Sequence, residues 1–217
     1  MTVYREKFHE DLTSLIEECI TLGKACHNRL STAVEILVTD NIEEARKLVK
    51  ADSEINQLES AINAHAINLI TTQAPVASDL RTIISCIKIA DDLERIGDNI
   101  SNIAEVRKRI KITNERTLLR FKTMERLASL MLEDVYTAFK ESDMDLIREI
   151  IERDKDIDAV FVQITTSDIF EESDAFLTGQ IQLTAKYLER IGDHIKSIAE
   201  HIYYTETGTP FEKGSRE

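Results

Sequence analysis

The chain has 217 residues, of which 42% are hydrophobic and 31% charged, with only two prolines, six glycines and no tryptophan. This composition suits long amphipathic helices and argues against a sheet-based fold, which needs many turn residues. The formal net charge is −13, and no run of lysine or arginine stands out, so we do not expect binding to nucleic acid or to anionic lipid.

The N-terminal residues lack the apolar segment of a secretion signal, and no window of about 18 uncharged apolar residues is present to span a bilayer. The three cysteines, Cys19, Cys26 and Cys86, are odd in number, and the first two lie seven residues apart on one predicted helix. We interpret them as small core residues in a reducing compartment. The sequence therefore predicts a soluble, intracellular protein.

Three long helices are predicted in the first half of the chain. Apolar residues at spacings of three and four predict a helix over residues 3–38. Asn41 is a plausible N-cap for a second helix that continues to about Thr72. Pro75 then precedes a third helix, which extends to about Lys108, because proline is favourable at the start of a helix.

The segment 108–115 is basic and then polar and has no apolar periodicity, so it is the predicted linker, with the domain boundary near Thr113. Asp143 and Asp174 supply N-cap chemistry for two later helices. The second half is predicted to contain helices over residues 118–140, 143–171 and 174–204.

One six-residue motif occurs twice. Residues 93–98 and 188–193 both read Leu-Glu-Arg-Ile-Gly-Asp, 95 residues apart, and a wider window keeps five further identical pairs. The chain is therefore interpreted as a duplication. The predicted fold is all-α, with six long helices in two tandem three-helix bundles. The bundles are assigned to residues 1–112 and 113–208, and residues 209–217 to a polar C-terminal tail that we expect to be loosely ordered.

The repeated motif places acids on one face of its helix. At about 100° per residue, Glu94 and Asp98 lie on the same side as Asp91 and Glu105, opposite the isoleucines. A solvated face is the commonest meaning of such a stripe. However, two like charges four residues apart cost a helix about 0.2–0.5 kcal/mol. Both halves nevertheless keep the Glu and Asp while a neighbour has changed from Asp91 to Lys186, which favours a functional role.

The second helices of the two halves also correspond, with Asp52 matching Asp154 and Asn56 matching Asp158. If the second and third helices of each half pack as an antiparallel hairpin, four oxygen-bearing side chains can meet. Such groups suit hard or borderline cations, and several carboxylates can bridge more than one metal ion. The candidate metal ligands are Asp52, Asn56, Glu94 and Asp98 in the first half and Asp154, Asp158, Glu189 and Asp193 in the second.

Gly97 and Gly192 each cost about 1 kcal/mol relative to alanine inside a helix, so their shared position predicts tight helix packing, or room for an ion beside the acids. Catalysis is not predicted. No histidine is duplicated, only Glu6 and His9 match the Glu-x-x-His spacing of di-iron enzymes, and the sequence has no glycine-rich phosphate loop.

Three features together resemble the PhoU family of phosphate-transport regulatory proteins. They are the two Glu-Arg-Ile-Gly-Asp elements, the segment 73–81 (Gln-Ala-Pro-Val-Ala-Ser-Asp-Leu-Arg) and the ending 198–208 (Ile-Ala-Glu-His-Ile-Tyr-Tyr-Thr-Glu-Thr-Gly). The resemblance covers nearly the whole chain. It implies two three-helix bundles and a cytoplasmic, commonly dimeric protein without enzymatic activity, which reaches membranes only through its partners. The implied role is negative regulation of the phosphate-starvation response, between the ATPase subunit of the phosphate-specific ABC transporter and the phosphate-sensing histidine kinase.

The same resemblance implies multinuclear iron or zinc clusters on the Glu/Asp-x-x-x-Asp pairs. These ligands carry over to Glu94 and Asp98 with Asp52, and to Glu189 and Asp193 with Asp154 and Asp158. Asn56 departs from the acidic pattern and leaves the first site one charge weaker. Two alternatives stay open. One is an accessory or chaperone-like protein of a non-ABC phosphate permease, and the other is a carboxylate-bridged metal-storage or redox protein, which would lack its usual histidines.

Overall fold

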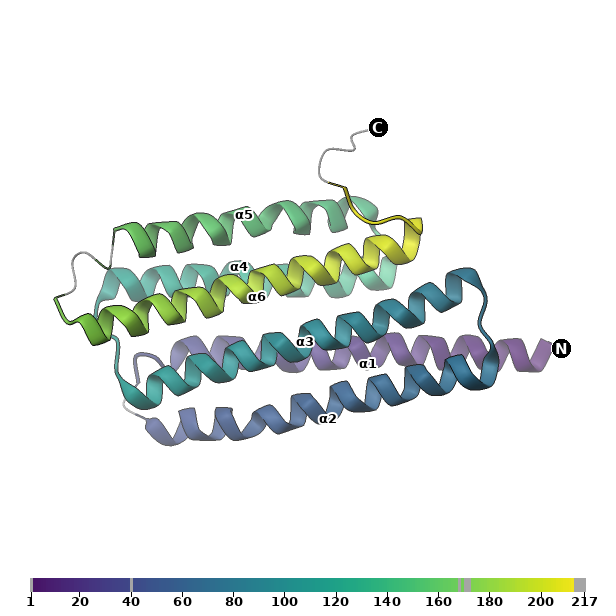
Figure 1. Cartoon of the computed structure of the whole chain (residues 1–217), viewed down its shortest axis with the longest axis horizontal. Helices are drawn as coiled ribbons and strands as arrows, with labels where there is room; N and C mark the ends of the chain where they lie inside the picture. The colour runs from purple at the N-terminus through teal and green to yellow at the C-terminus, as the bar shows by residue number, and fades with distance from the viewer. Residues whose placement is uncertain (1, 40, 168, 170–172, 213–217) are drawn as a thin grey trace.

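The computed structural model describes residues 2–39, 41–167, 169 and 173–212, with the side chains of residues 2–5 excepted. Long helices lie side by side along the long axis of the molecule (Figure 1). They are α1 (Thr2–Glu35), α2 (Ile42–Gln73), α3 (Ala77–Arg109), α4 (Glu115–Glu141), α5 (Met144–Thr166) and α6 (Ala175–Thr207). The described ranges contain these six helices and no strand, so the predicted all-α class is confirmed.

The three helices of each half pack on one another, α1 with α2 and α3, and α4 with α5 and α6. The halves meet mainly through α3 and α6, which lie next to each other across the middle of the molecule, and also through α1 and α4 behind them (Figure 1). This arrangement is the predicted pair of tandem three-helix bundles. The predicted boundary near Thr113 falls between α3 and α4, and the division into residues 1–112 and 113–208 stays a prediction. None of the described helices combines the length and apolar character that a bilayer span requires.

Side-chain caps fix where several helices begin. The carboxylate of Asp143 accepts hydrogen bonds from two backbone N–H groups of α5, and Asp174 does the same for α6. Asn41 accepts one from the backbone of Glu44. Asn114, which the sequence analysis did not single out, caps α4 in the same way, and α4 therefore begins at Glu115 instead of residue 118.

Two helices end earlier than predicted. α1 stops at Glu35, and the chain then turns, with the N–H of Leu37 donating to the carbonyl of Val34. α5 ends at Thr166 instead of residue 171, because Thr165, Thr166 and Ser167 are poor helix formers whose hydroxyls compete for backbone groups. Residues 168, 170–172 and 213–217, which include part of this predicted helix and of the predicted tail, lie outside the described residues.

The predicted core role of the cysteines is confirmed. All three are free and buried. The thiol of Cys19 donates to the carbonyl of Cys86 at 3.7 Å, and that of Cys26 to the carbonyl of Leu93 at 3.3 Å, so both help α1 pack against α3. Burial raises the pKa of Cys26 to about 12, which keeps the thiol protonated and unreactive near neutral pH.

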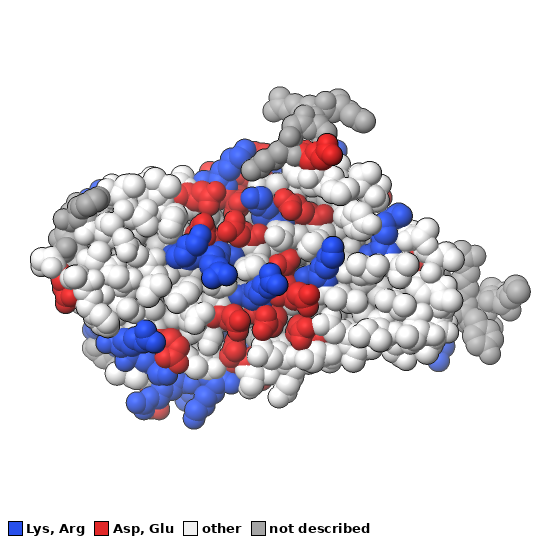
Figure 2. Space-filling view, in the orientation of Figure 1, with Lys and Arg blue, Asp and Glu red and all other residues white. Residues whose placement is uncertain are grey.

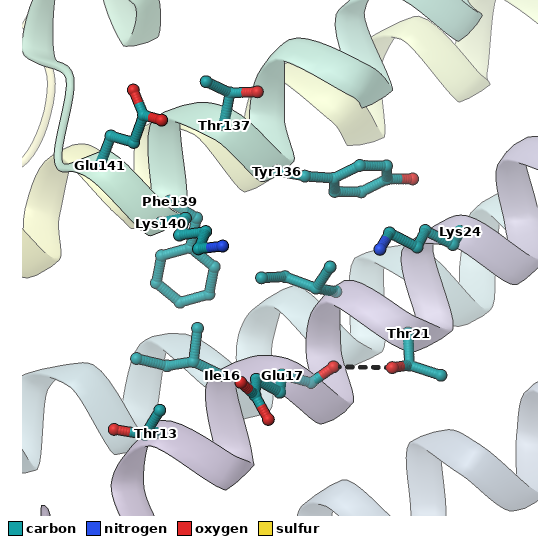
Figure 3. A pocket seen from close by; sticks show the side chains of 11 residues that line it. Thr13, Ile16, Glu17, Thr21, Lys24, Tyr136, Thr137, Phe139, Lys140 and Glu141 are labelled. Atoms are coloured by element: carbon teal, nitrogen blue, oxygen red, sulfur yellow. Dashed lines mark hydrogen bonds between the residues drawn. The ribbon is translucent and has the colours of Figure 1, made fainter.

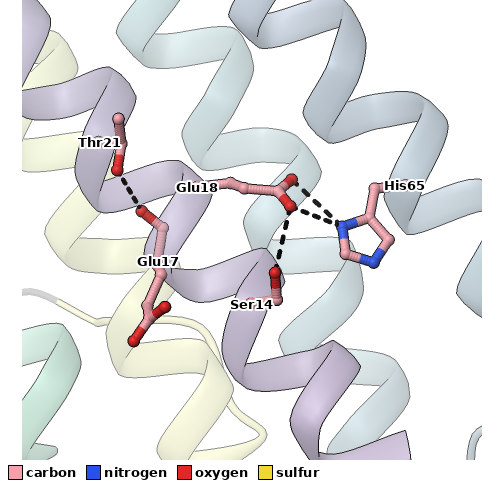
Figure 4. Close-up of polar contacts among 5 residues, drawn as sticks. All are labelled: Ser14, Glu17, Glu18, Thr21 and His65. Atoms are coloured by element: carbon pink, nitrogen blue, oxygen red, sulfur yellow. Dashed lines mark hydrogen bonds and ion pairs between the residues drawn. The ribbon is translucent and has the colours of Figure 1, made fainter.

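A polar contact joins α1 to α2 at the edge of the first bundle (Figure 4). Glu18 of α1 lies with its two carboxylate oxygens 3.0 and 3.2 Å from Nδ1 of His65 on α2. Ser14, one turn earlier on α1, donates its hydroxyl to the same carboxylate at 3.4 Å. The contact is partly exposed, so its contribution to stability is modest.

The two motif glycines stand at close approaches between helices. A Cβ atom added to Gly97 would lie 2.9 Å from Cγ2 of Ile55 on α2. One added to Gly192 would lie 2.9 Å from Cδ1 of Ile157 on α5. Tight helix packing at both positions, as predicted, is confirmed, and the partner is the corresponding isoleucine in each half.

We expect Gly97→Ala to lower the free energy of unfolding by about 1–3 kcal/mol, because the new methyl group overlaps a stiff β-branched side chain. Gly192→Ala should lower it by a similar amount, since its methyl group would lie 2.9 Å from Cδ1 of Ile157 and 3.1 Å from Oδ1 of the buried Asp154. Gly179→Ala on α6 is the matched control: nothing lies within 4 Å of its added Cβ, so it should stabilise by up to about 1 kcal/mol. Urea unfolding of the three variants tests this order, and equal stability of the Gly97 and Gly179 variants would contradict it.

Candidate functional site

Acidic side chains gather in two groups near the middle of one face of the molecule, with basic side chains between them (Figure 2). One group lies over α2 and α3 and the other over α5 and α6. Each half forms its group from an antiparallel pair of helices, as the sequence predicts (Figure 1). Each half of the duplicated chain thus contributes one acidic group to this face.

The first acidic group is formed by Asp52 on α2 and by Glu94 and Asp98 on α3. Burial raises the pKa of the Asp52 carboxyl, the charge of Asp98 raises it further, and Arg29 offsets part of this. Burial likewise raises the pKa of Glu94, and Asp98, Glu59 and Asp52 add to the shift. The structure therefore brings the three predicted carboxylates together. It adds Glu59, seven residues after Asp52 on the same face of α2, which was not predicted.

The second acidic group contains all four predicted carboxylates, from α5 and α6. Burial raises the pKa of Asp158, and the charges of Asp154 and Asp193 raise it further. Burial also raises the pKa of Asp193, with Glu189 and then Asp154 adding to it. Asp154 is only 2% exposed. Asp158 and its counterpart Asn56 both stand exposed on their helices, and a ligand role for Asn56 stays a prediction.

Two lysines enter the second group. The Lys196 ammonium donates to Oδ2 of Asp154 at 2.9 Å, and this hydrogen bond raises the pKa of Lys196. The Lys186 ammonium donates to both carboxylate oxygens of Glu189, at 2.6 and 2.5 Å. The second group therefore contains part of its own compensating positive charge.

The donor set of the first group fits a hard or borderline cation in its chemistry. Its oxygens are carboxylate oxygens, and Oδ1 of Asp52 is buried without a hydrogen-bond partner, as is Oδ1 of Asp154 in the second group. In the present side-chain orientations, no three His, Cys, Asp or Glu residues of the described ranges form a group that holds a metal ion. Metal binding there therefore requires the acidic side chains to turn toward one another.

A buried carboxylate between the two halves was not predicted. Asp92 on α3 is 7% exposed and faces two histidines of α6, with Oδ1 2.9 Å from Nδ1 of His194 and Oδ2 3.3 Å from Nε2 of His201. Burial alone would raise the pKa of Asp92, but the contacts with both histidines outweigh it, and the pKa is lowered. None of the three residues is repeated in the other half, so the duplication carries no signal for this contact.

A groove of about 720 Å³ separates α1 from α4 (Figure 3). Ile16 and Phe139 give it an apolar floor, and Lys24 and Lys140 lie at its sides. Tyr136 also lines it, and the hydroxyl of this residue is buried without a hydrogen-bond partner. This groove was not predicted, because it depends on which faces of two helices about 100 residues apart are brought together.

The fold and the paired acidic groups define a duplicated helical protein with a matched carboxylate cluster in each half. The model of the PhoU domain matches residues 20–106 and 121–202, and the chain belongs to the PhoU family.

Curated relatives match over nearly their full length. The chain is 30% identical to the phosphate-specific transport system accessory protein PhoU homolog of Clostridium acetobutylicum, over 94% of this chain and 96% of the relative. It is 28% identical to the phosphate-specific transport system accessory protein PhoU of Escherichia coli, over 94% of this chain and 87% of the relative.

Two crystal structures share the fold. The phosphate transport system regulatory protein PhoU from Streptococcus pneumoniae has a TM-score of 0.87 and 28% identity, over 94% of this chain and 99% of that one. PhoU from Pseudomonas aeruginosa has a TM-score of 0.85 and 28% identity, over 93% of this chain and 100% of that one. The predicted family and the predicted fold are both confirmed.

We expect Asp92→Asn to lower the free energy of unfolding at pH 7 by about 1–3 kcal/mol, because hydrogen bonds to a charged group are lost between the halves. The folded pKa of Asp92 is depressed, so its stabilisation is fully present above the unfolded pKa of about 3.9 and is lost as the pH falls through the folded pKa. Urea unfolding of the wild type and the variant should therefore converge below about pH 4. Asp91→Asn, at an exposed neighbouring position, is the control. A difference independent of pH would contradict the assignment.

Proposed function

We propose that the protein is a cytoplasmic accessory protein of phosphate transport that negatively regulates the phosphate-starvation response. It acts as a homodimer that couples the ATPase subunit of the phosphate-specific ABC transporter to the phosphate-sensing histidine kinase, and it is not an enzyme. The observation that carries the proposal is the match of both halves to the PhoU domain, together with relatives of the phosphate-specific transport system that align over nearly the whole chain. The three free, buried cysteines suit the reducing compartment that this role requires.

The acidic groups are the proposed metal sites. Asp52, Glu94 and Asp98 would hold iron or zinc in the first half, and the second-half candidates are Asp154, Asp158, Glu189 and Asp193. When bound, the metal supplies positive charge that offsets the repulsion among the carboxylates. The carboxylates themselves tie α2 to α3 and α5 to α6. Their clustering and the raised pKa values of Asp52 and Glu94 support this part of the proposal.

The same face is the proposed docking surface. Both acidic groups lie on one side of the molecule, across α2, α3, α6 and α5, so a single partner surface can contact both (Figure 2). Charges arranged in this way steer a basic partner and set its orientation more than they add affinity. Metal bound in the groups would change the charge that a partner meets. This links the proposed metal binding to the choice between transporter and kinase.

Elemental analysis of protein purified without chelator or nickel affinity tests the metal. We expect iron or zinc in the wild type and its loss in the quadruple variant Glu94→Ala, Asp98→Ala, Glu189→Ala, Asp193→Ala. A matched control removes four exposed acids of α1 and α4: Glu6→Ala, Glu10→Ala, Glu17→Ala and Glu141→Ala. The control should keep its metal. Unchanged metal content in the quadruple variant would exclude these carboxylates as ligands.

Co-purification tests the partners. Under high phosphate, the wild type should co-purify with the transporter ATPase subunit and with the histidine kinase. The quadruple variant should bind both more weakly, because the docking surface has lost its charge, while the control variant on α1 and α4 should bind as the wild type does. Absence of both partners from the wild-type preparation would contradict the coupling role.

A further inference from the structure

The two acidic groups can be compared position by position. Gly97 packs on Ile55, and Gly192 packs on Ile157, so the contact between α2 and α3 has the same register as that between α5 and α6. Residues on α3 and α6 then correspond at a difference of 95, and those on α2 and α5 at a difference of 102. Differences in side chain between these positions are therefore differences within one shared geometry.

Three positions around the carboxylates have changed in charge between the halves. Ser101 in the first half corresponds to Lys196 in the second, Asp91 corresponds to Lys186, and Glu59 corresponds to Phe161. Each change makes the first group more negative or the second more positive. Together these three changes alter the charge by more than the change from Asn56 to Asp158 does, and that change alone would make the first site the weaker one.

Lys196 provides a buried ion pair in the second group. Its ammonium lies 2.9 Å from Oδ2 of Asp154, whose side chain is 3% exposed, while the lysine side chain is 23% exposed. The other oxygen, Oδ1, is buried without a hydrogen-bond partner, so Lys196 compensates the carboxylate through Oδ2 alone. A charge-assisted hydrogen bond at this depth is strong, and removing one partner leaves the other charge buried and uncompensated. The corresponding serine of the first half carries no charge.

Lys186 provides a second ammonium group. It contacts both oxygens of Glu189, whose side chain is 13% exposed, and lies 5.6 Å from the centre of the Phe161 ring. The aromatic face and the carboxylate both attract the cation, so together they fix its position. At the corresponding place, the first half has Asp91 and Glu59, so it has two further carboxylates and no ammonium group of its own there, which favours a cation from solution.

The positive charges near the first group are arginines. Arg29 acts on Asp52, and Arg95 acts on Glu94. Arg29 is itself engaged, with Nη2 2.5 Å from a carboxylate oxygen of Glu54. Arg95 is exposed, and its counterpart Arg190 is also exposed, so it does not distinguish the halves.

We propose that the second acidic group is closed to metal by the chain's own Lys186 and Lys196, and that of the two groups only the first binds metal. The inference rests on the proposed metal binding and restricts it to one half. A divalent cation entering the second group has to displace Lys196 from Asp154 and leave an ammonium group beside the metal. That repulsion, together with the lost ion pair, opposes binding. The second group then acts as a permanent internal ion-pair cluster that joins α5 to α6.

Equilibrium dialysis against Zn²⁺, with zinc measured by elemental analysis, tests the inference. Asp52→Asn with Asp98→Asn should abolish wild-type binding, whereas Asp154→Asn with Asp193→Asn should leave it unchanged. Lys186→Asp with Lys196→Ser introduces the first-half residues into the second half and should bind about twice the zinc of the wild type. Lys122→Asp with Lys140→Ser makes the same charge change at exposed positions of α4 and should bind as the wild type does.

Thermal unfolding of chelator-treated protein gives a second readout. The double lysine variant should melt below the wild type and the α4 control, because Asp154 loses its partner, and added Zn²⁺ should restore it more than it stabilises the wild type. If this variant does not fold, the two Asp→Asn pairs still decide the question, since they preserve side-chain shape.

The outcomes separate the inference from the function on which it rests. Equal loss of zinc in the two Asp→Asn pairs would overturn the restriction to one half and leave the proposed metal binding intact. A double lysine variant that folds and binds no more zinc than the α4 control would also overturn it. Zinc binding by none of the proteins would overturn the proposed metal binding and this inference together.

Discussion

The backbone of α3 meets Ile55 of α2 at Gly97, and the backbone of α6 meets Ile157 of α5 at Gly192. Since the glycine has no side chain, the isoleucine packs directly on the helix backbone, and the two helices of each pair are held at one distance and in one register. The predicted carboxylates stand one residue after this contact or three residues before it, so their meeting depends on it. Glycine lowers the stability of an isolated helix. Here its lack of a side chain allows the close packing on which the positions of the acidic groups depend.

The helices α3 and α6 each have two packing tasks, because they complete their own bundle and also form the main contact between the halves. Burying the carboxylate of Asp92 in this contact is costly unless it is paired. Both histidines that pair with it belong to α6, so the compensation exists only while the halves are docked. Ser85 adds a hydrogen bond to the carbonyl of His201 at 3.3 Å. The relative position of the bundles is therefore fixed by polar contacts as well as by apolar packing.

The helices were predictable because apolar spacing, end caps and glycine positions are local signals. The acidic groups were predictable because both halves keep the Glu and Asp of the repeated motif, which are Glu94 and Asp98 in the first half, while neighbouring residues differ between the halves. Other features depend on which helix faces meet, and sequence spacing does not report this. The contact of Asp92 with α6 and the groove between α1 and α4 are of this kind. The lysines of the second half were visible in the sequence, but only the ion pair between Lys196 and Asp154 shows that one of them reaches across to α5.

Duplication copies a set of carboxylates, but the chemistry of each copy depends on residues that the motif does not include. Lys196 lies three residues after Asp193 on α6. Its ammonium nevertheless donates to Asp154 on α5, across the contact between the two helices. Its counterpart Ser101 cannot supply charge. Two groups with the same acidic motif therefore differ in whether a lysine of the chain bonds to the carboxylate on the second helix of the half. A substitution at one neighbouring position is enough to change this difference. The electrostatic energy of a buried carboxylate depends far more on the nearest positive charge than on the net charge of the protein.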